Sequence, residues 1–144
     1  MTWRNCLLVD KGERSLDAII VYFSIISQYR EGIMEQVIAN RQSGNAWVSL
    51  PMDLPRTDGY IAVQDCRELE NIWWVENPVT MEWESMLVVD CARPPGTDLA
   101  YERMNENNVA MEVDYETAER WGTLGRGIWA HWSTAYPEGP MLER

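Results

Sequence analysis

The sequence predicts an α+β domain: a mostly antiparallel sheet of about five or six strands, one long helix packed on a face, and short C-terminal helices. Two stretches indicate this class. Residues 72–90 concentrate strand-forming side chains, and residues 16–40 carry apolar side chains at helical spacing. Further strand patterns follow, with short helix patterns late in the chain, and no internal repeat or linker divides them.

The stretch 72–90 is interpreted as three consecutive strands. Residues 72–75 are apolar, and the Asn77–Pro78 step after them favours a turn. Residues 79–84 alternate between apolar and polar side chains, as in a strand with one buried face. Residues 86–89 are apolar at consecutive positions, which predicts a strand covered on both faces.

The stretch 16–40 allows two interpretations. From Leu16 to about Asn40 the apolar positions follow the three-four spacing of one long amphipathic helix. Residues 18–26 are rich in strand-forming side chains, so a strand there and a helix from Ser27 is the alternative. If the long helix crosses the sheet, four side chains should be buried together: Phe23, Met81, Trp83 and Val88.

Shorter elements complete the predicted domain. Further strands are expected at 3–9, 46–50, 60–63 and 109–114. Short helices are expected at 66–69, 98–105, 115–121 and 127–136. Asp65 and Asp114 occupy N-cap positions of two of these helices, and Gly122 occupies the position where a helix commonly stops.

The length of 144 residues predicts one domain, over residues 1–136, and an extended tail at 137–144. No apolar run reaches the roughly 18 residues that a membrane span needs. The chain begins without the basic and apolar regions of a secretory signal. We therefore expect a cytoplasmic (intracellular) protein or a component of a virion.

The formal net charge is −11, which restricts the classes of partner. A strongly acidic surface repels phosphate groups, so direct binding to nucleic acid or to an anionic membrane is not expected. Another protein remains as the expected partner, in a homo- or hetero-oligomeric assembly.

The sequence contains no pattern of catalytic or metal-binding residues. His131 is the only histidine, and the three cysteines, Cys6, Cys66 and Cys91, are dispersed without a C-x-x-C pair. All three cysteines are expected to be buried free thiols. We therefore expect no catalytic residue, no metal, no cofactor and no enzymatic activity.

The partner-binding residues predicted from the sequence are Trp73, Trp74, Glu82, Glu84 and Arg126. The adjacent tryptophans must point to opposite faces of a strand, so one indole is exposed unless both faces are covered. The two glutamates share a face of the predicted strand at 79–84, and Arg126 lies in a glycine-rich turn where it could hold an anion.

The function predicted from these features is a non-enzymatic protein–protein interaction domain. It would be a subunit or accessory protein of a larger assembly, with the size and composition of a small phage structural or connector protein. Eight tryptophans support this hypothesis, because tryptophan and arginine are enriched among the residues that anchor interfaces. One alternative is an acidic inhibitor that mimics nucleic acid and blocks a nucleic-acid-binding or defence complex. Another is a small-molecule enzyme that uses Glu82 or Glu84 with Arg126 in a tryptophan-lined pocket.

Overall fold

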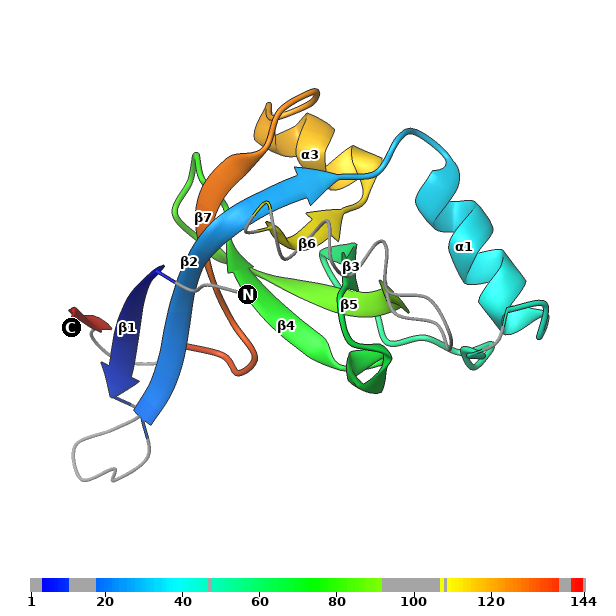
Figure 1. Ribbon diagram of the computed structural model, residues 1–144, viewed down its shortest axis with the longest axis horizontal. Helices are drawn as coiled ribbons and strands as arrows, with labels where there is room; N and C mark the ends of the chain where they lie inside the picture. Colours follow the sequence, from blue (N-terminus) through cyan, green and yellow to red (C-terminus); the bar gives the residue numbers. More distant parts are fainter. Residues whose placement is uncertain are drawn as a thin grey trace.

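A computed structural model describes residues 4–10, 18–46, 48–91, 107, 109–137 and 141–143. Six strands close into a β-barrel (Figure 1). They are β2 (Ala18–Gln28), β3 (Gly59–Val63), β4 (Ile72–Glu76), β5 (Trp83–Cys91), β6 (Val109–Val113) and β7 (Ile128–Ser133). Their order is β6–β3–β5–β4–β7–β2, and pairing of β2 with β6 closes the ring.

Two of the six pairings in the barrel are parallel. β2 runs parallel to β6, and β3 runs parallel to β5, whereas the other neighbours are antiparallel. A parallel pair cannot be joined by a tight hairpin, so the chain must cross over between such strands. The connection from β2 to β3, two strands that are not paired with each other, contains α1 (Ile33–Gln42).

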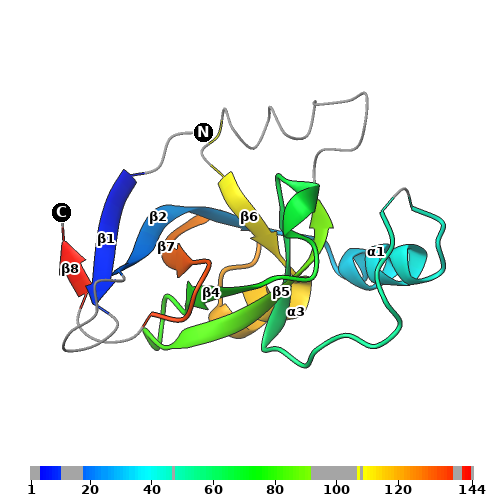
Figure 2. The same ribbon diagram turned by 90° about the horizontal axis from the view of Figure 1, so that it is seen from below.

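Two further strands extend the sheet beyond the barrel. β1 (Arg4–Asp10) pairs antiparallel with the first half of β2, and β8 (Met141–Glu143) pairs with the other edge of β1. The tail that we expected to be extended thus contributes a short strand. The two strands and α1 lie at opposite ends of the molecule, with the barrel between them (Figures 1 and 2).

The predicted α+β class is wrong, because the structure is a closed six-strand barrel with two short helices in the described part of the chain. The single long helix at 16–40 is also wrong. The alternative is closer, since β2 ends at Gln28 and α1 begins at Ile33 after Gly32 in the left-handed region. β-Branched side chains at 19–21, 25 and 26 favour a strand over the helical spacing that the same residues also satisfy.

Three other predicted elements differ from the structure. Residues 127–136 were expected to be a helix, but they contain β7. In this strand Ala130 and Trp132 are buried, whereas Trp129 is exposed. The strand expected at 46–50 does not form at the described residues 46 and 48–50. The helix expected at 98–105 lies outside the described residues.

Most of the other predicted elements are confirmed. β3, β4 and β5 contain the strands expected at 60–63, 72–75 and 86–89, β1 overlaps the strand expected at 3–9, and β6 covers all but the last residue of the strand expected at 109–114. Asp65 caps a short 3₁₀ helix, η1 (Cys66–Glu68), through a hydrogen bond from the Arg67 amide. Asp114 caps α3 (Tyr115–Trp121) through the Thr117 amide, and Gly122 ends this helix at a φ of 76°.

The strand predicted at 79–84 is wrong and so is the core built on it. Residues 78–80 form the turn of the β4–β5 hairpin, and Met81 beside them is 62% exposed. Val88 lies in the barrel interior, whereas Trp83 packs on Ile19 and Val21 in a separate cluster. Phe23 is only half-buried, because it lies on the outside of β2.

The barrel interior is a close-packed apolar core. Trp73 and Trp132 stack at its centre with ring centroids 4.7 Å apart, and Tyr22 stacks on Trp132 at 4.6 Å. The fully buried side chains around them come from five strands: Ile26, Ile61, Val63, Val75, Met86, Val88 and Met111. The interior is therefore filled by side chains, as in other small barrels.

One outer face of the barrel is covered by α1. Leu87 and Val89 point outward from β5, alternate with the inward Met86 and Val88, and pack against Met34 and Leu50. The prediction of a strand covered on both faces at 86–89 is confirmed, since all four residues are buried. We refer to Leu87, Val89, Met34 and Leu50 as the α1-covered face.

Candidate functional site

The two adjacent tryptophans of β4 point to opposite sides of the barrel wall. Trp73 is buried in the interior, and its Nε1 has no hydrogen-bond partner among the described residues. Trp74 points outward, is half-buried, and meets the ring of Tyr136 edge-on at a centroid distance of 4.7 Å. Of the pair, only Trp74 presents a surface that a partner could touch.

Glu84 is buried at the start of β5 and is held by several donors. Arg120 Nη1 donates to Oε1 at 2.7 Å and to Oε2 at 2.8 Å. Asn77 Nδ2 and Trp121 Nε1 donate to Oε2 at 2.8 and 3.2 Å. The carboxylate thus ties α3 to the β4–β5 hairpin, and its hydrogen bonds are used within the protein.

Glu82 is exposed beside the turn of the β4–β5 hairpin, whereas Glu84 is buried. The Asn77 side-chain oxygen accepts hydrogen bonds from the amides of Val79 and Thr80, which fixes the turn. Met81 adopts a φ of 64°, in the left-handed region that non-glycine residues rarely occupy. Val79 and Met81 are both exposed beside Glu82. The two glutamates therefore do not form a paired carboxylate site.

Arg126 is exposed in the turn between α3 and β7. Its Nη2 donates to the carbonyl of Gly122 at 3.3 Å, which closes the turn on itself. The glycine-rich segment 122–127 therefore connects a helix to a strand. Among the described residues, no hydrogen bond or ion pair joins Arg126 to the tryptophans or glutamates of the predicted site.

A surface that the sequence analysis missed lies on the outside of β2 and β7. Phe23 pairs with His131 across the two strands, and its ring lies 4.7 Å from the imidazole and 5.3 Å from the indole of Trp129. His131 Nδ1 lies 3.0 Å from Glu76 Oε1 of β4. We refer to Phe23, Glu76, Trp129 and His131 as the Trp129 face.

Trp129 is the most exposed member of this face, at 41% of its surface. In the helix expected at 127–136, Trp129 and Trp132 would lie on the same side of the helix. The signal for a strand is the alternation at 128–133, in which the even positions Ala130 and Trp132 point inward. That period places Trp129 and His131 together on the outside.

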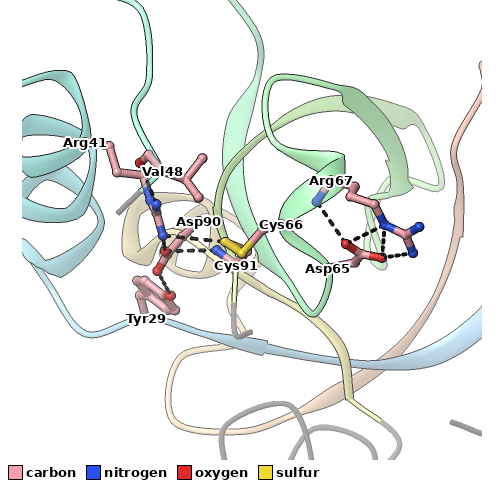
Figure 3. The surroundings of a disulfide bond; sticks show 8 residues. All are labelled: Tyr29, Arg41, Val48, Asp65, Cys66, Arg67, Asp90 and Cys91. Atoms are coloured by element: carbon pink, nitrogen blue, oxygen red, sulfur yellow. Dashed lines mark hydrogen bonds and ion pairs between the residues drawn. A yellow bond between two sulfur atoms is a disulfide. The ribbon is translucent and has the colours of Figure 1, made fainter. Parts of the chain in front are cut away.

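A buried polar cluster lies between α1 and the end of β5. Arg41 is 7% exposed, and its Nη2 donates to Asp90 while its Nη1 donates to the carbonyl of Val48 at 2.8 Å. The hydroxyl of Tyr29 donates to the other oxygen of Asp90 (Figure 3). Burial raises the pKa of Tyr29, and the charge of Asp90 adds to this effect. Burial, followed by the charge of Asp90, raises the pKa of Glu112.

A disulfide adjoins this cluster. Cys66 of η1 is bonded to Cys91, the last residue of β5, across a sequence separation of 25 residues. The expectation that all cysteines are free thiols is therefore wrong. Neither cysteine belongs to a local motif, and only the parallel pairing of β3 with β5, which aligns Val63 with Cys91, brings the two together.

The described part of the chain contains no cluster of three or more histidine, cysteine or acidic side chains that could hold a metal ion. None of its helices combines the length and the apolar character required to cross a membrane. Comparison with known proteins found no matching family model, no matching curated protein and no matching solved structure.

Proposed function

We propose that this chain is a non-enzymatic protein-binding domain, a subunit or accessory protein of a larger assembly, and that the Trp129 face contacts its partner. The observation that carries this proposal is the exposure of Trp129 beside Phe23 on a wall of the barrel. Tryptophan is the residue type most enriched among the energetic anchors of protein interfaces.

The position of the Trp129 face on the barrel supports its role as a contact surface. Trp129 is paired with Ile25 of β2, and β7 is also paired with β4 at Trp132 and Ser133, so the strand that carries Trp129 is part of the barrel wall. Phe23 restricts the indole further through ring contact. Binding through side chains that are already ordered loses less conformational entropy than binding through mobile ones.

The charge of the molecule indicates the chemistry of the partner. With a net charge of −11, this chain attracts a protein surface that surrounds an apolar centre with lysine or arginine. The apolar centre would receive Trp129, and the basic rim would be attracted by the net negative charge of the chain as a whole. Aromatic contacts would then supply most of the affinity, because exposed charges are screened by salt.

The polar contacts of the acids favour this proposal over the two alternatives. Glu76, Glu84 and Asp90 each lie within ion-pair distance of a histidine or an arginine, so they do not present the bare rows of charge that a nucleic-acid mimic needs. A carboxylate enzyme based on Glu84 would need a free acceptor oxygen, and that carboxylate already binds Arg120, Asn77 and Trp121.

The proposal is tested by capturing partners from a lysate of the source organism with the immobilised protein. Trp129→Ser should weaken the captured interaction by about 2 kcal/mol or more. Leu124→Ser is the matched control, because Leu124 is a similarly exposed apolar residue in the turn after α3. It should leave binding unchanged, and an increase of salt to about 0.5 M should weaken binding of the wild type only slightly, because the aromatic contacts supply most of the affinity.

Two results would contradict the proposal. If Trp129→Ser binds as tightly as the wild type, the Trp129 face is not the contact. If affinity instead falls steeply with salt and ignores both Trp129→Ser and Trp74→Ala, charge dominates the contact and the nucleic-acid mimic becomes the better hypothesis.

A further inference from the structure

The disulfide has charged residues on both sides. Those near Cys91 are largely buried, and those next to Cys66 in sequence are exposed. On the Cys91 side, Figure 3 shows Arg41, Asp90 and Tyr29, which belong to the buried polar cluster. On the Cys66 side are its sequence neighbours Asp65 and Arg67, whose ion pair is exposed to solvent. Both cysteines are half-buried.

Among the described residues, Arg41 is hydrogen-bonded to only one of the two sulfurs. Its Nη2 lies 3.6 Å from Cys91 Sγ, within reach of a hydrogen bond to sulfur. The guanidinium is almost fully buried, and its Nε has no partner among the described residues. A positive charge in such surroundings stabilises a neighbouring thiolate more than an exposed charge does.

We propose that Cys66–Cys91 is a site of thiol–disulfide exchange, in which a small thiol attacks Cys66 and Cys91 leaves as a thiolate stabilised by Arg41. The site would take a small thiol of the glutathione class. The asymmetry of the contacts with Arg41 determines the direction, since the sulfur that leaves more readily is the one with the lower thiol pKa.

The electrons and atoms of the exchange balance in two steps. The thiolate of the small thiol forms a bond to Cys66 Sγ while the bond between the two cysteines breaks, and the electron pair goes to Cys91 Sγ. A second thiolate then attacks the sulfur of the small molecule, which leaves as its own disulfide. Cys66 is released as a thiolate, so the small thiol is oxidised and the protein is reduced by two electrons.

The acids near Cys91 oppose Arg41, and their own contacts limit this opposition. Asp90 accepts from the Cys91 amide at 2.9 Å, from Arg41 and from Tyr29, so its charge is shared among three donors. Burial, and after it the charge of Asp90, raises the pKa of Glu112 of β6, so this acid also faces the cluster. Arg41 thus donates to Cys91, and none of its hydrogen bonds reaches Cys66.

The first test locates the mixed disulfide in the full-length chain with Cys6→Ser, which removes the third thiol. The protein is treated with reduced glutathione under native conditions, free thiols are blocked with maleimide, and peptides are identified by mass spectrometry. We expect glutathione on Cys66 and maleimide on Cys91, in about tenfold excess over the reverse pattern. Glutathione chiefly on Cys91, equal amounts on both, or no mixed disulfide without denaturant would overturn the proposal.

The second test measures the thiolate itself. In Cys6→Ser, Cys66→Ser protein, the absorbance of the Cys91 thiolate is followed against pH, in the native state and in denaturant. The apparent pKa should be lower in the native state, and an equal or higher native value would count against the role of Arg41.

Substitutions then assign the effect to Arg41. Arg41→Lys should retain the preference for Cys66 in the first test, and Arg41→Gln should abolish it. Arg67→Gln is the control, because Arg67 is the sequence neighbour of Cys66 and its ion pair with Asp65 is exposed. Loss of the preference in Arg67→Gln, or its persistence in folded Arg41→Gln, would contradict the assignment.

Discussion

The α1-covered face and the Trp129 face lie on different parts of the same barrel wall and differ in what packs on them. On the first, Leu87 and Val89 are completely buried by α1 and the segment after it. On the second, Trp129 remains exposed, although its ring is larger and equally apolar. The chain thus supplies a cover for one outer face, and among the described residues it supplies none for Trp129.

This difference separates the apolar side chains that contribute to folding, on the α1-covered face, from those that are available for binding, on the Trp129 face. Removing a buried aliphatic side chain loses its transfer free energy and leaves a cavity. Removing an exposed one changes the folded state little, because that side chain contacts water in both states. The two faces should therefore separate in mutational experiments.

The largest expected effect is at Leu87. Leu87→Ala should lower the free energy of unfolding by about 4 kcal/mol, because a fully buried side chain is replaced by a cavity. Trp129→Ala should lower it by only about 1 kcal/mol, mostly through lost contact with Phe23. Urea unfolding of both variants measures the two values, and equal losses would show that the Trp129 face is also part of the folding core.

The disulfide should have the next largest effect. Cys66→Ser combined with Cys91→Ser should lower the free energy of unfolding by about 3 kcal/mol, because the unfolded chain gains the entropy of an open loop. Hydrogen exchange should increase most at η1 and at the end of β5. The Trp129 face should be unaffected, and an equal increase in β7 would mean that the two sides of the barrel are coupled.

Glu84 tests whether a buried polar network contributes as much as the apolar cover. Glu84→Gln should lower the free energy of unfolding by about 2 kcal/mol, since the charge-assisted bonds from Arg120 are weakened. The loss in thermal and urea unfolding should be smaller than that of Leu87→Ala. If Glu84→Gln leaves the free energy of unfolding unchanged, the cost of desolvating the carboxylate equals the stabilisation from its hydrogen bonds.

The smallest effect is a pH dependence from Glu112. Its folded-state pKa lies above the ordinary value, so the folded protein binds this proton more tightly than the unfolded chain does. The favourable contribution is therefore complete below the unfolded pKa and is lost as pH rises through the folded pKa.

Glu112→Gln isolates this contribution from that of the other carboxylates. The variant should gain stability relative to the wild type as pH is raised from about 4.5 to about 7.5, in urea titrations at each pH. A difference between the two proteins that does not vary with pH would show that Glu112 has no raised pKa in solution.

The sequence predicts most elements that depend on local chemistry. The N-cap at Asp114 and the stop at Gly122 bound α3, as side-chain capping and the left-handed conformation of glycine require. The alternation at 109–113 identifies β6, and the apolar run at 86–89 identifies a strand buried on both sides. Each of these signals depends on a few neighbouring residues, so it can be recognised without knowing how the strands are paired.

The errors have a common physical cause. Residues 16–40 and 127–136 satisfy the helical spacing as well as a strand pattern, and only pairing with distant strands decides between them. The Trp129 face was missed because it exists only when β2 and β7 are adjacent. Likewise Cys66 and Cys91 meet only through the pairing of β3 with β5.

The closure of the barrel has a consequence for how the protein is made. β7 fills the gap between β4 and β2, so the ring stays open on the ribosome until residue 133 has emerged. Until then β2 and β4 expose edges that can pair with other chains. Contacts such as Ile25 with Val109 join distant segments, which slows folding relative to a helical protein of this size. We therefore expect nascent chains that stall before β7 to be the most aggregation-prone species of this protein.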